Sequence, residues 1–112
     1  MYKILQRNMI HHGFQYKEGL IIDINPFNAS GSCEKGGLYY TTTKFIALFL
    51  DYSDLIAEVN LPDDAKIYAD PNGNKWKADR IILKNIKNIQ DSELWNDYKF
   101  CLEAVRQKST IT

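Results

Sequence analysis

The sequence contains two histidines and two cysteines, side chains that often serve in metal binding and nucleophilic catalysis. His11 and His12 are adjacent, and neighbouring side chains of a strand point to opposite faces, so this pair is poorly placed to hold one ion. Cys33 stands near Lys35, which could lower the pKa of the thiol, but a nucleophile also needs a positioned base, for which His12 is the candidate. We therefore expect no metal site and interpret Cys33 as a small apolar residue that closes a loop onto the sheet.

Three nearby glycines, Gly31, Gly36 and Gly37, raise the question of a phosphate-binding loop. Such a loop directs backbone N–H groups from a helix N-terminus, whereas residues 37–42 have the aromatic and β-branched composition of a strand. Neither common glycine-rich nucleotide-binding pattern occurs. We expect these glycines to supply positive φ angles and close backbone approach before a central strand.

A basic segment covers residues 75–87 and contains one acidic residue, Asp79. Its cations are Lys75, Lys77, Arg80, Lys84 and Lys87. With Trp76 they could bind a nucleic-acid backbone by charge and stacking. On a strand, however, Lys75 and Lys77 would share one face and Trp76 the other, so charge and aromatic ring diverge. We expect mainly a solvated face, with Lys75, Lys77 and Arg80 as candidates for contacts with a partner.

The whole chain of 112 residues is large enough for one domain and carries 14 basic and 14 acidic residues, so its formal net charge is zero. This balance argues against a dedicated nucleic-acid binder. We find no apolar run near the roughly 20 residues of a membrane span, and the N-terminal apolar segment is too short for a secretory signal. We expect an intracellular protein that is not secreted. Whether Cys33 and Cys101 pair stays open.

Alternating and β-prone stretches predict a series of short strands, at residues 2–5, 13–16, 19–24, 37–42, 55–62, 65–70 and 75–83. The three-residue link "KEG" predicts a hairpin over residues 13–24, and "DPNGNK" predicts a second hairpin over residues 65–83. Alternation in residues 55–62 directs Ala57 and Val59 toward the core.

Two segments have helical periodicity. In residues 43–52, Phe45, Leu48, Phe49 and Tyr52 share one apolar face. In residues 91–108 an apolar stripe comprises Leu94, Tyr98, Cys101, Leu102 and Val105. Trp95 borders this stripe and Phe100 points away from it, so both are candidates for contact with a partner chain.

These elements predict an α+β fold: a small, mostly antiparallel twisted sheet with one short buried helix (about 43–52) and a C-terminal helix (about 91–108). We expect residues 1–90 to form the core domain and residues 91–112 to pack on it or mediate association. The expected core consists of Phe14, Tyr16, Leu20, Ile22, Leu38, Tyr40, Phe45, Phe49, Val59, Leu61, Ile67, Trp76, Ile81 and Leu83.

The stretches "GFQY" (13–16), "GGLYYT" (36–41) and "KWKADRIIL" (75–83) resemble an uncharacterised domain of mimivirus-like giant viruses. The resemblance covers roughly residues 13–83, and related short modules occur in phages. In the viral proteins this domain often precedes ankyrin or other repeats. The resemblance implies a viral protein of the host cytoplasm or virion, either standing alone or belonging to a longer chain, and it brings no catalytic residue.

A second, weaker resemblance is to ADP-ribosyltransferases of the poly(ADP-ribose) polymerase type. "HG" (12–13), the strand before residue 41, the helix of residues 43–52 and "AEVNLP" (57–62) follow the order of that fold. It implies NAD binding through His12, Gly13 and Tyr39. The catalytic candidates that it implies are His12, Tyr39, Tyr40 and Asp79. The family places a glutamate on a late strand, whereas the only nearby acid here is Asp79.

The function we predict is a non-catalytic viral recognition or adaptor domain that needs no cofactor and acts through protein–protein contacts or self-association. One alternative is an ADP-ribosyltransferase-like enzyme or a degenerate relic that binds NAD or another small nucleotide. The other is weak nucleic-acid binding through residues 75–87.

Overall fold

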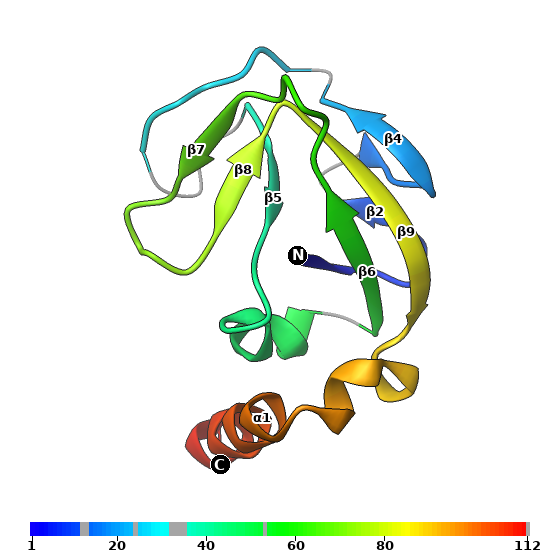
Figure 1. The fold of residues 1–112 in the computed structure, drawn as a ribbon, viewed down its shortest axis with the longest axis vertical. Helices are drawn as coiled ribbons and strands as arrows, with labels where there is room; N and C mark the ends of the chain where they lie inside the picture. The colour runs from blue at the N-terminus through cyan, green and yellow to red at the C-terminus, as the bar shows by residue number, and fades with distance from the viewer. Residues whose placement is uncertain (12–13, 24, 32–35, 53, 112) are drawn as a thin grey trace.

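The computed structural model describes residues 1–11, 14–23, 25–31, 36–52 and 54–111. The chain starts with β1 (Tyr2–Leu5), β2 (Ile10–His11), β3 (Phe14–Gln15) and β4 (Gly19–Ile22). It continues with β5 (Leu38–Tyr40), the 3-10 helix η1 (Ile46–Tyr52), β6 (Leu55–Asn60), β7 (Ile67–Ala69), β8 (Trp76–Ala78) and β9 (Arg80–Asn88). The 3-10 segments η2 (Ile89–Asp91) and η3 (Glu93–Asn96) lead into α1 (Tyr98–Ile111) at one end of the molecule (Figure 1).

The larger sheet has four antiparallel strands in the order β1-β6-β9-β4. Its inner face carries the alternating residues Leu5, Ile21, Ala57, Val59, Ile81 and Leu83. The outer face carries Tyr2, Ile4, Leu20, Ile22, Ile56, Glu58, Asn60, Arg80, Ile82 and Lys84. The β6–β9 register shifts between Ile56 and Glu58, and Asn85 at this irregularity has a φ angle of 52°.

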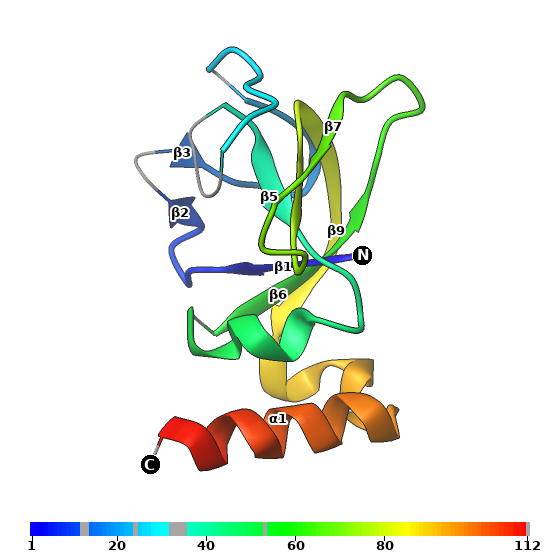
Figure 2. The same cartoon turned by 90° about the vertical axis from the view of Figure 1, so that its left-hand side faces the viewer.

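The smaller sheet has three antiparallel strands in the order β5-β8-β7. The predicted turn joins β7 to β8, with Gly73 at a φ angle of 77°. Tyr2 and Thr41 exchange backbone hydrogen bonds of 2.8 and 2.9 Å, which link β1 to the end of β5. Only Asp79 separates β8 from β9, so the two sheets wrap around one interior, as the two views in Figures 1 and 2 show.

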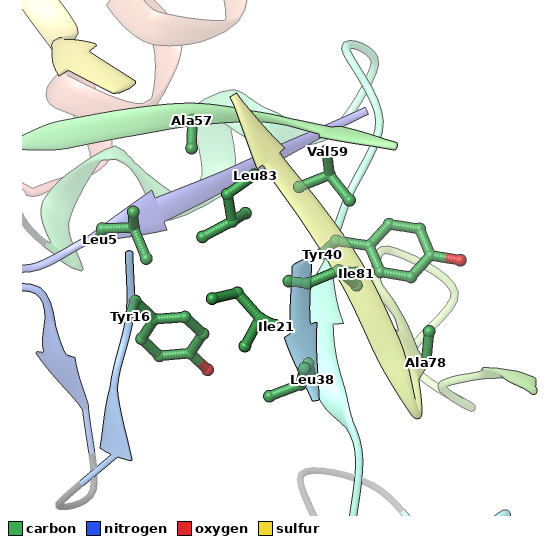
Figure 3. Close-up of a cluster of buried hydrophobic side chains, with 10 residues drawn as sticks. All are labelled: Leu5, Tyr16, Ile21, Leu38, Tyr40, Ala57, Val59, Ala78, Ile81 and Leu83. Carbon is green, nitrogen blue, oxygen red and sulfur yellow. The ribbon is translucent and has the colours of Figure 1, made fainter. Parts of the chain in front are cut away.

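The main core lies inside this wrap, where the inner face of the larger sheet meets β5 and β8 (Figure 3). Its buried members are Leu5, Tyr16, Ile21, Leu38, Tyr40, Ala57, Val59, Ala78, Ile81 and Leu83. The Tyr40 ring stacks on the Trp76 ring at a centroid distance of 6.4 Å. The centroid of the Phe45 ring lies 6.2 Å from that of Trp76. Tyr40 and Trp76 therefore meet on the core side of the smaller sheet.

A second core lies on the outer face, where η1 and α1 cover one half of the larger sheet. Its buried members are Ile46, Ala47, Ile56, Leu94 and Phe100. Figure 2 shows α1 running beneath η1. We call this the covered half of the outer face, and we call the other half, which includes Leu20 and Ile22, the open half.

Side-chain caps begin the helical segments of the C-terminal region. The Ser92 hydroxyl accepts a hydrogen bond of 3.2 Å from the Leu94 N–H at the start of η3. The Asp97 carboxylate accepts bonds from the backbone N–H groups of Lys99 (2.9 Å) and Phe100 (3.1 Å) at the start of α1. The cap of α1 is therefore Asp97, because a carboxylate there satisfies otherwise unpaired N–H groups.

The predicted α+β class and antiparallel sheets are confirmed, but both helices differ from their prediction. The buried helix expected at residues 43–52 is a 3-10 helix that begins at Ile46. The helix expected at residues 91–108 is divided into short 3-10 segments and α1, because Asp97 caps the start of a new helix. This helix extends to Ile111, beyond the expected end.

The predicted hairpin over residues 13–24 is wrong, since β3 pairs with β2 while β4 pairs with β9. The prediction that Leu20 and Ile22 of β4 face the core is also wrong: both are exposed, and Ile21 between them is buried. Ile67 on β7 is exposed as well, and Phe45, Phe49, Leu61 and Trp76 are half-buried. The side chain of Phe14, also expected in the core, lies outside the described residues.

Candidate functional site

A row of three side chains crosses the smaller sheet on the face opposite Trp76. Tyr39 of β5, Lys77 of β8 and Tyr68 of β7 are direct cross-strand partners. The Lys77 Nζ atom lies 5.7 Å from the centre of the Tyr39 ring and 5.3 Å from that of Tyr68. At 0% exposure, Lys77 is buried between the rings, which is a favourable cation–π arrangement. The prediction of a solvated strand face is therefore wrong for Lys77.

Gly37 allows the chain to pass directly over Lys77. A Cβ atom at this position would come within 2.6 Å of the Lys77 Cδ atom, and the Gly37 φ angle of 148° also disfavours other residues. The Gly37 N–H donates a 2.6 Å hydrogen bond to the Asp23 carboxylate, and the Tyr68 hydroxyl donates one of 2.9 Å to the Gly31 carbonyl. Gly36 has a φ angle of 91°, and a Cβ atom there would collide with the Pro26 carbonyl, so both glycines have the predicted role of close approach before a strand. Cys33 lies outside the described residues.

The other cations of the basic segment are largely engaged within the molecule. Arg80 forms ion pairs with Asp64 at 2.8 Å and with Asp79 at 3.5 Å. The hydrogen bond from Arg80 lowers the pKa of the Asp64 carboxyl. Lys87 donates a 2.6 Å hydrogen bond to Glu93, which lowers the pKa of that carboxyl. These pairs reduce the charge that the segment could offer to a phosphate backbone.

Lys75 is half-buried and keeps its Nζ atom over the Tyr39 ring, 5.0 Å from the ring centre. The Lys75–Lys77 side of the strand therefore meets two tyrosine rings, although Trp76 points the other way as predicted. The two tyrosines are visible in the sequence as β-prone residues of predicted strands. The sequence does not reveal the cross-strand register that aligns both of them with Lys77.

Sequence reasoning missed Lys3, whose side chain enters the interior from β1. Its Nζ atom donates a 2.7 Å hydrogen bond to the Tyr39 carbonyl and lies 5.0 Å from the centre of the Tyr16 ring. Removal of this ammonium group from water lowers the pKa of Lys3 to about 8. Burial also raises the pKa of Tyr16 to about 12, with a smaller effect from Asp23.

The residues expected to form a transferase site are not brought together among those the structure describes. His12 and Gly13 lie outside the described residues. Tyr40 is buried in the main core, whereas Tyr39 is half-buried against the lysines. The Asp79 carboxylate accepts a 2.8 Å hydrogen bond from the Lys66 N–H and pairs with Arg80, so it has a structural role at the start of β7. Within the described ranges, no three His, Cys, Asp or Glu residues could share a metal ion.

Of the two aromatic residues expected to contact a partner chain, Phe100 belongs to the second core, whereas Trp95 is 37% exposed. Phe100 is 2% exposed, so the prediction that it points away from the core is wrong. Its ring meets Trp95 edge-on at a centroid distance of 4.8 Å, and the Trp95 Nε1–H donates a 2.8 Å bond to the Ile89 carbonyl. Cys101 is a free thiol that donates to the Trp95 carbonyl at 3.0 Å. The helix turns its other side, including Leu102, toward solvent.

The open half of the outer face ends at β4, which lies at the margin of the molecule beside β9 (Figure 1). On the side of β4 away from β9, no other strand within the described residues is paired with it. Leu20 is 49% exposed and Ile22 is 58% exposed, and both stand on this edge strand next to the half-buried Ile82. Scattered apolar residues are common on surfaces, but two on an open strand edge form a potential contact site.

The chain has relatives among the proteins of Acanthamoeba polyphaga mimivirus. The chain is 34% identical over 99 residues to the putative ankyrin repeat protein R868 of Acanthamoeba polyphaga mimivirus, covering 84% of this chain and 49% of the relative. It is 38% identical over 88 residues to the putative ankyrin repeat protein R229, covering 72% of this chain and 29% of the relative. It is also 32% identical to the uncharacterised protein R869 of the same virus, covering 92% of this chain and 75% of the relative.

The chain belongs to this mimivirus protein family. It spans about half or less of the length of the ankyrin-named relatives R868 and R229. The resemblance to a giant-virus domain is thereby confirmed, whereas the resemblance to ADP-ribosyltransferases gains no support from these relatives. No family model matches the sequence. No solved structure matches it either.

Among the described residues of this mimivirus family member, no helix has the length and apolar character that crossing a bilayer requires.

Proposed function

We propose that this chain is a non-catalytic recognition domain of a viral protein that acts through protein–protein contacts, and that the open edge of β4 is its contact surface. The exposure of Leu20 and Ile22 on this edge is the observation that carries the proposal. An extended segment of a partner would add a strand beside β4, with main-chain hydrogen bonds supplying affinity and the two side chains supplying selectivity.

The four residues of β4 itself include neither a charged residue nor a proline, while the charged Glu18 and Asp23 flank the strand. Edge strands are commonly guarded by a lysine, a proline or a bulge, and Gly19–Ile22 contains none of these. The names of the relatives R868 and R229 also support a role in contacts, since repeat arrays present extended surfaces for binding. The paired or buried cations of the basic segment favour this role over nucleic-acid binding.

The edge formed by β7 provides a matched control. Ile67 on β7 is 52% exposed, close to the values of Leu20 and Ile22, and β7 is also the last strand of its sheet. It differs from β4 in offering one large apolar residue rather than two, and the exposed residue directly before it is Lys66, whereas the exposed Glu18 precedes β4. We expect Lys66 to protect β7 against strand addition.

The test is photo-crosslinking in amoebal cells that express the tagged chain, with a photoreactive amino acid in place of Leu20 or, as the control, Ile67. The expected result is a discrete adduct from position 20 that excess wild-type protein competes away and excess Leu20→Lys/Ile22→Lys protein does not. Mass spectrometry of the adduct identifies the partner. Absence of a competed adduct at position 20, or the same adduct from position 67, contradicts the proposal.

A further inference from the structure

We propose that the segment added to this edge is β4 of a second copy of the chain, paired antiparallel about a two-fold axis that passes at Ile21. This inference rests on the proposed role of the β4 edge and names its partner. Pairing of the two edges would join the four-stranded sheets into one continuous sheet, β1-β6-β9-β4-β4-β9-β6-β1. Closed two-fold dimers that use the same surface on both chains are the commonest soluble assemblies.

The backbone of β4 determines which groups are available for this pairing. The Asp23 N–H donates to the Asp79 carbonyl at 3.2 Å, so the backbone of residue 23 points toward the β9 side. Backbone direction alternates along an antiparallel strand, so Ile21 also points toward β9, and Leu20 and Ile22 point away from it. The N–H and C=O groups at the open edge are therefore those of Leu20 and Ile22, whose side chains are also exposed.

Only residues with outward backbone groups can exchange hydrogen bonds across the new interface. With the axis at Ile21, Leu20 of each copy lies opposite Ile22 of the other, and the two outward residues of each strand satisfy those of its partner. A shift of the axis to Leu20 would place Ile22 opposite the exposed Glu18, which lies outside the strand. The register about Ile21 is therefore favoured over this one, because it sets Ile22 against the apolar Leu20 instead of a charged residue.

In this register the exposed apolar side chains of the two copies lie next to one another. Within one chain Leu20 lies beside Ile82 of β9. Across the axis it would lie beside Ile22 of the second copy, so Leu20, Ile22 and Ile82 of both chains would form one cluster on the outer face. Direct neighbours on adjacent strands bring their Cβ atoms to about 4.5–5.5 Å, so each side chain would shield the next from water.

The charges near the edge permit two copies to approach. The formal net charge of the chain is zero, so no overall repulsion opposes association. Asp23 would face Gly19 of the second copy, and its carboxylate already accepts the Gly37 N–H. A Cβ atom at Gly19 would meet nothing within 4 Å, so the face of β4 at this position is uncrowded.

The first test is sedimentation velocity of the wild-type chain over a wide concentration range, with circular dichroism to verify folding. The expected result is a monomer–dimer equilibrium whose dissociation constant is at least tenfold weaker in Leu20→Lys and in Ile22→Lys and unchanged in Ile67→Lys. Ile22→Pro should also weaken the dimer, since proline removes an N–H that points to the open edge and is not used by β9. A chain that stays monomeric throughout, or a dimer unaffected at both β4 positions, overturns the inference.

Amide hydrogen exchange supplies a readout that does not depend on a variant folding. Exchange of the Leu20 and Ile22 amides should slow as the protein concentration rises, while that of Ile21, whose N–H points to β9, should not change. If both amides exchange independently of concentration, the second copy is not the partner. The crosslinking experiment then separates the two ideas, because an adduct with a different protein at position 20 would support the recognition role alone.

Discussion

The two halves of the outer face of the larger sheet carry similar apolar residues with opposite outcomes. In the covered half, Ile56 is buried beneath η1 and α1 together with Phe100. In the open half, Leu20 and Ile22 stand on the same face and remain exposed. Residue type does not separate them, since Ile56 and Ile22 are both isoleucines on strands. The difference comes from η1 and the C-terminal segment, because the second core that they form with the sheet lies over one half only.

The largest expected effect on stability comes from truncating Phe100, a buried residue of the second core. Phe100→Ala should lower the free energy of unfolding by about 3–5 kcal/mol, because the ring is buried against Trp95 and its removal leaves a cavity. Urea denaturation followed by circular dichroism measures the change. Leu102→Ala on the solvent side of α1 is the matched control and should cost only about 0.5 kcal/mol or less. Equal costs for the two variants would mean that α1 does not cover the sheet in the orientation described.

The inner face differs from both outer halves in holding the ammonium group of Lys3. The Lys3 pKa of about 8 is below its unfolded value near 10.5, so the unfolded state binds more protons between these values. Stability should therefore rise with pH from about 8 toward 10, by at most about 3 kcal/mol. Above pH 10 it should fall, because the raised Tyr16 pKa of about 12 means that the unfolded tyrosine loses its proton first.

Urea denaturation at a series of pH values tests this expectation, with Lys3→Met as the comparison. The variant should lack the rise between pH 8 and 10 and retain the fall above pH 10. Its absolute stability is not the readout, because methionine also leaves the Tyr39 carbonyl without the Lys3 hydrogen bond. The same rise in both proteins would show that the Lys3 ammonium group is not the source.

A smaller effect is expected from the cap that starts the covering helix. Asp97→Ala removes the acceptor of the Lys99 and Phe100 N–H groups and should cost about 1 kcal/mol. Asp97→Asn retains an acceptor and should restore most of that loss. Amide exchange near residue 99 would locate the change, and faster exchange confined to β4 instead would contradict the assignment of Asp97 as the cap.

Much of the fold was predictable because its signals are local. The β7–β8 hairpin follows from "DPNGNK", and the inward direction of Ala57 and Val59 follows from alternation in β6. The α+β class follows from short strands and two helical periodicities. These features depend on turn chemistry and side-chain periodicity, which act over a few residues.

The errors arose where local signals allow two answers. The β4 stretch "GLIIDI" has apolar residues at both parities, so alternation cannot decide between Ile21 and its neighbours, and pairing with β9 decides it. In α1, apolar side chains occur on both sides, and tertiary packing selects Phe100 over Leu102. The Tyr39–Lys77–Tyr68 row also required the pairing of β8 with β5, which is distant in sequence from the β7–β8 hairpin.

The smallest expected effect on stability belongs to the open half. At concentrations where the chain is monomeric, Ile22→Thr should change the free energy of unfolding by no more than about 0.5 kcal/mol, because the side chain is exposed and threonine suits a strand. Ile21→Val, one position earlier but facing the main core, should cost about 0.5–1.5 kcal/mol. If Ile22→Thr instead cost as much as Ile21→Val in dilute solution, Ile22 would be covered within the monomer, and the contrast between the two halves would fail. A small effect in dilute solution that grows with protein concentration would mean that Ile22 acts between chains rather than within one, which is the behaviour expected of an edge strand that is completed by a partner.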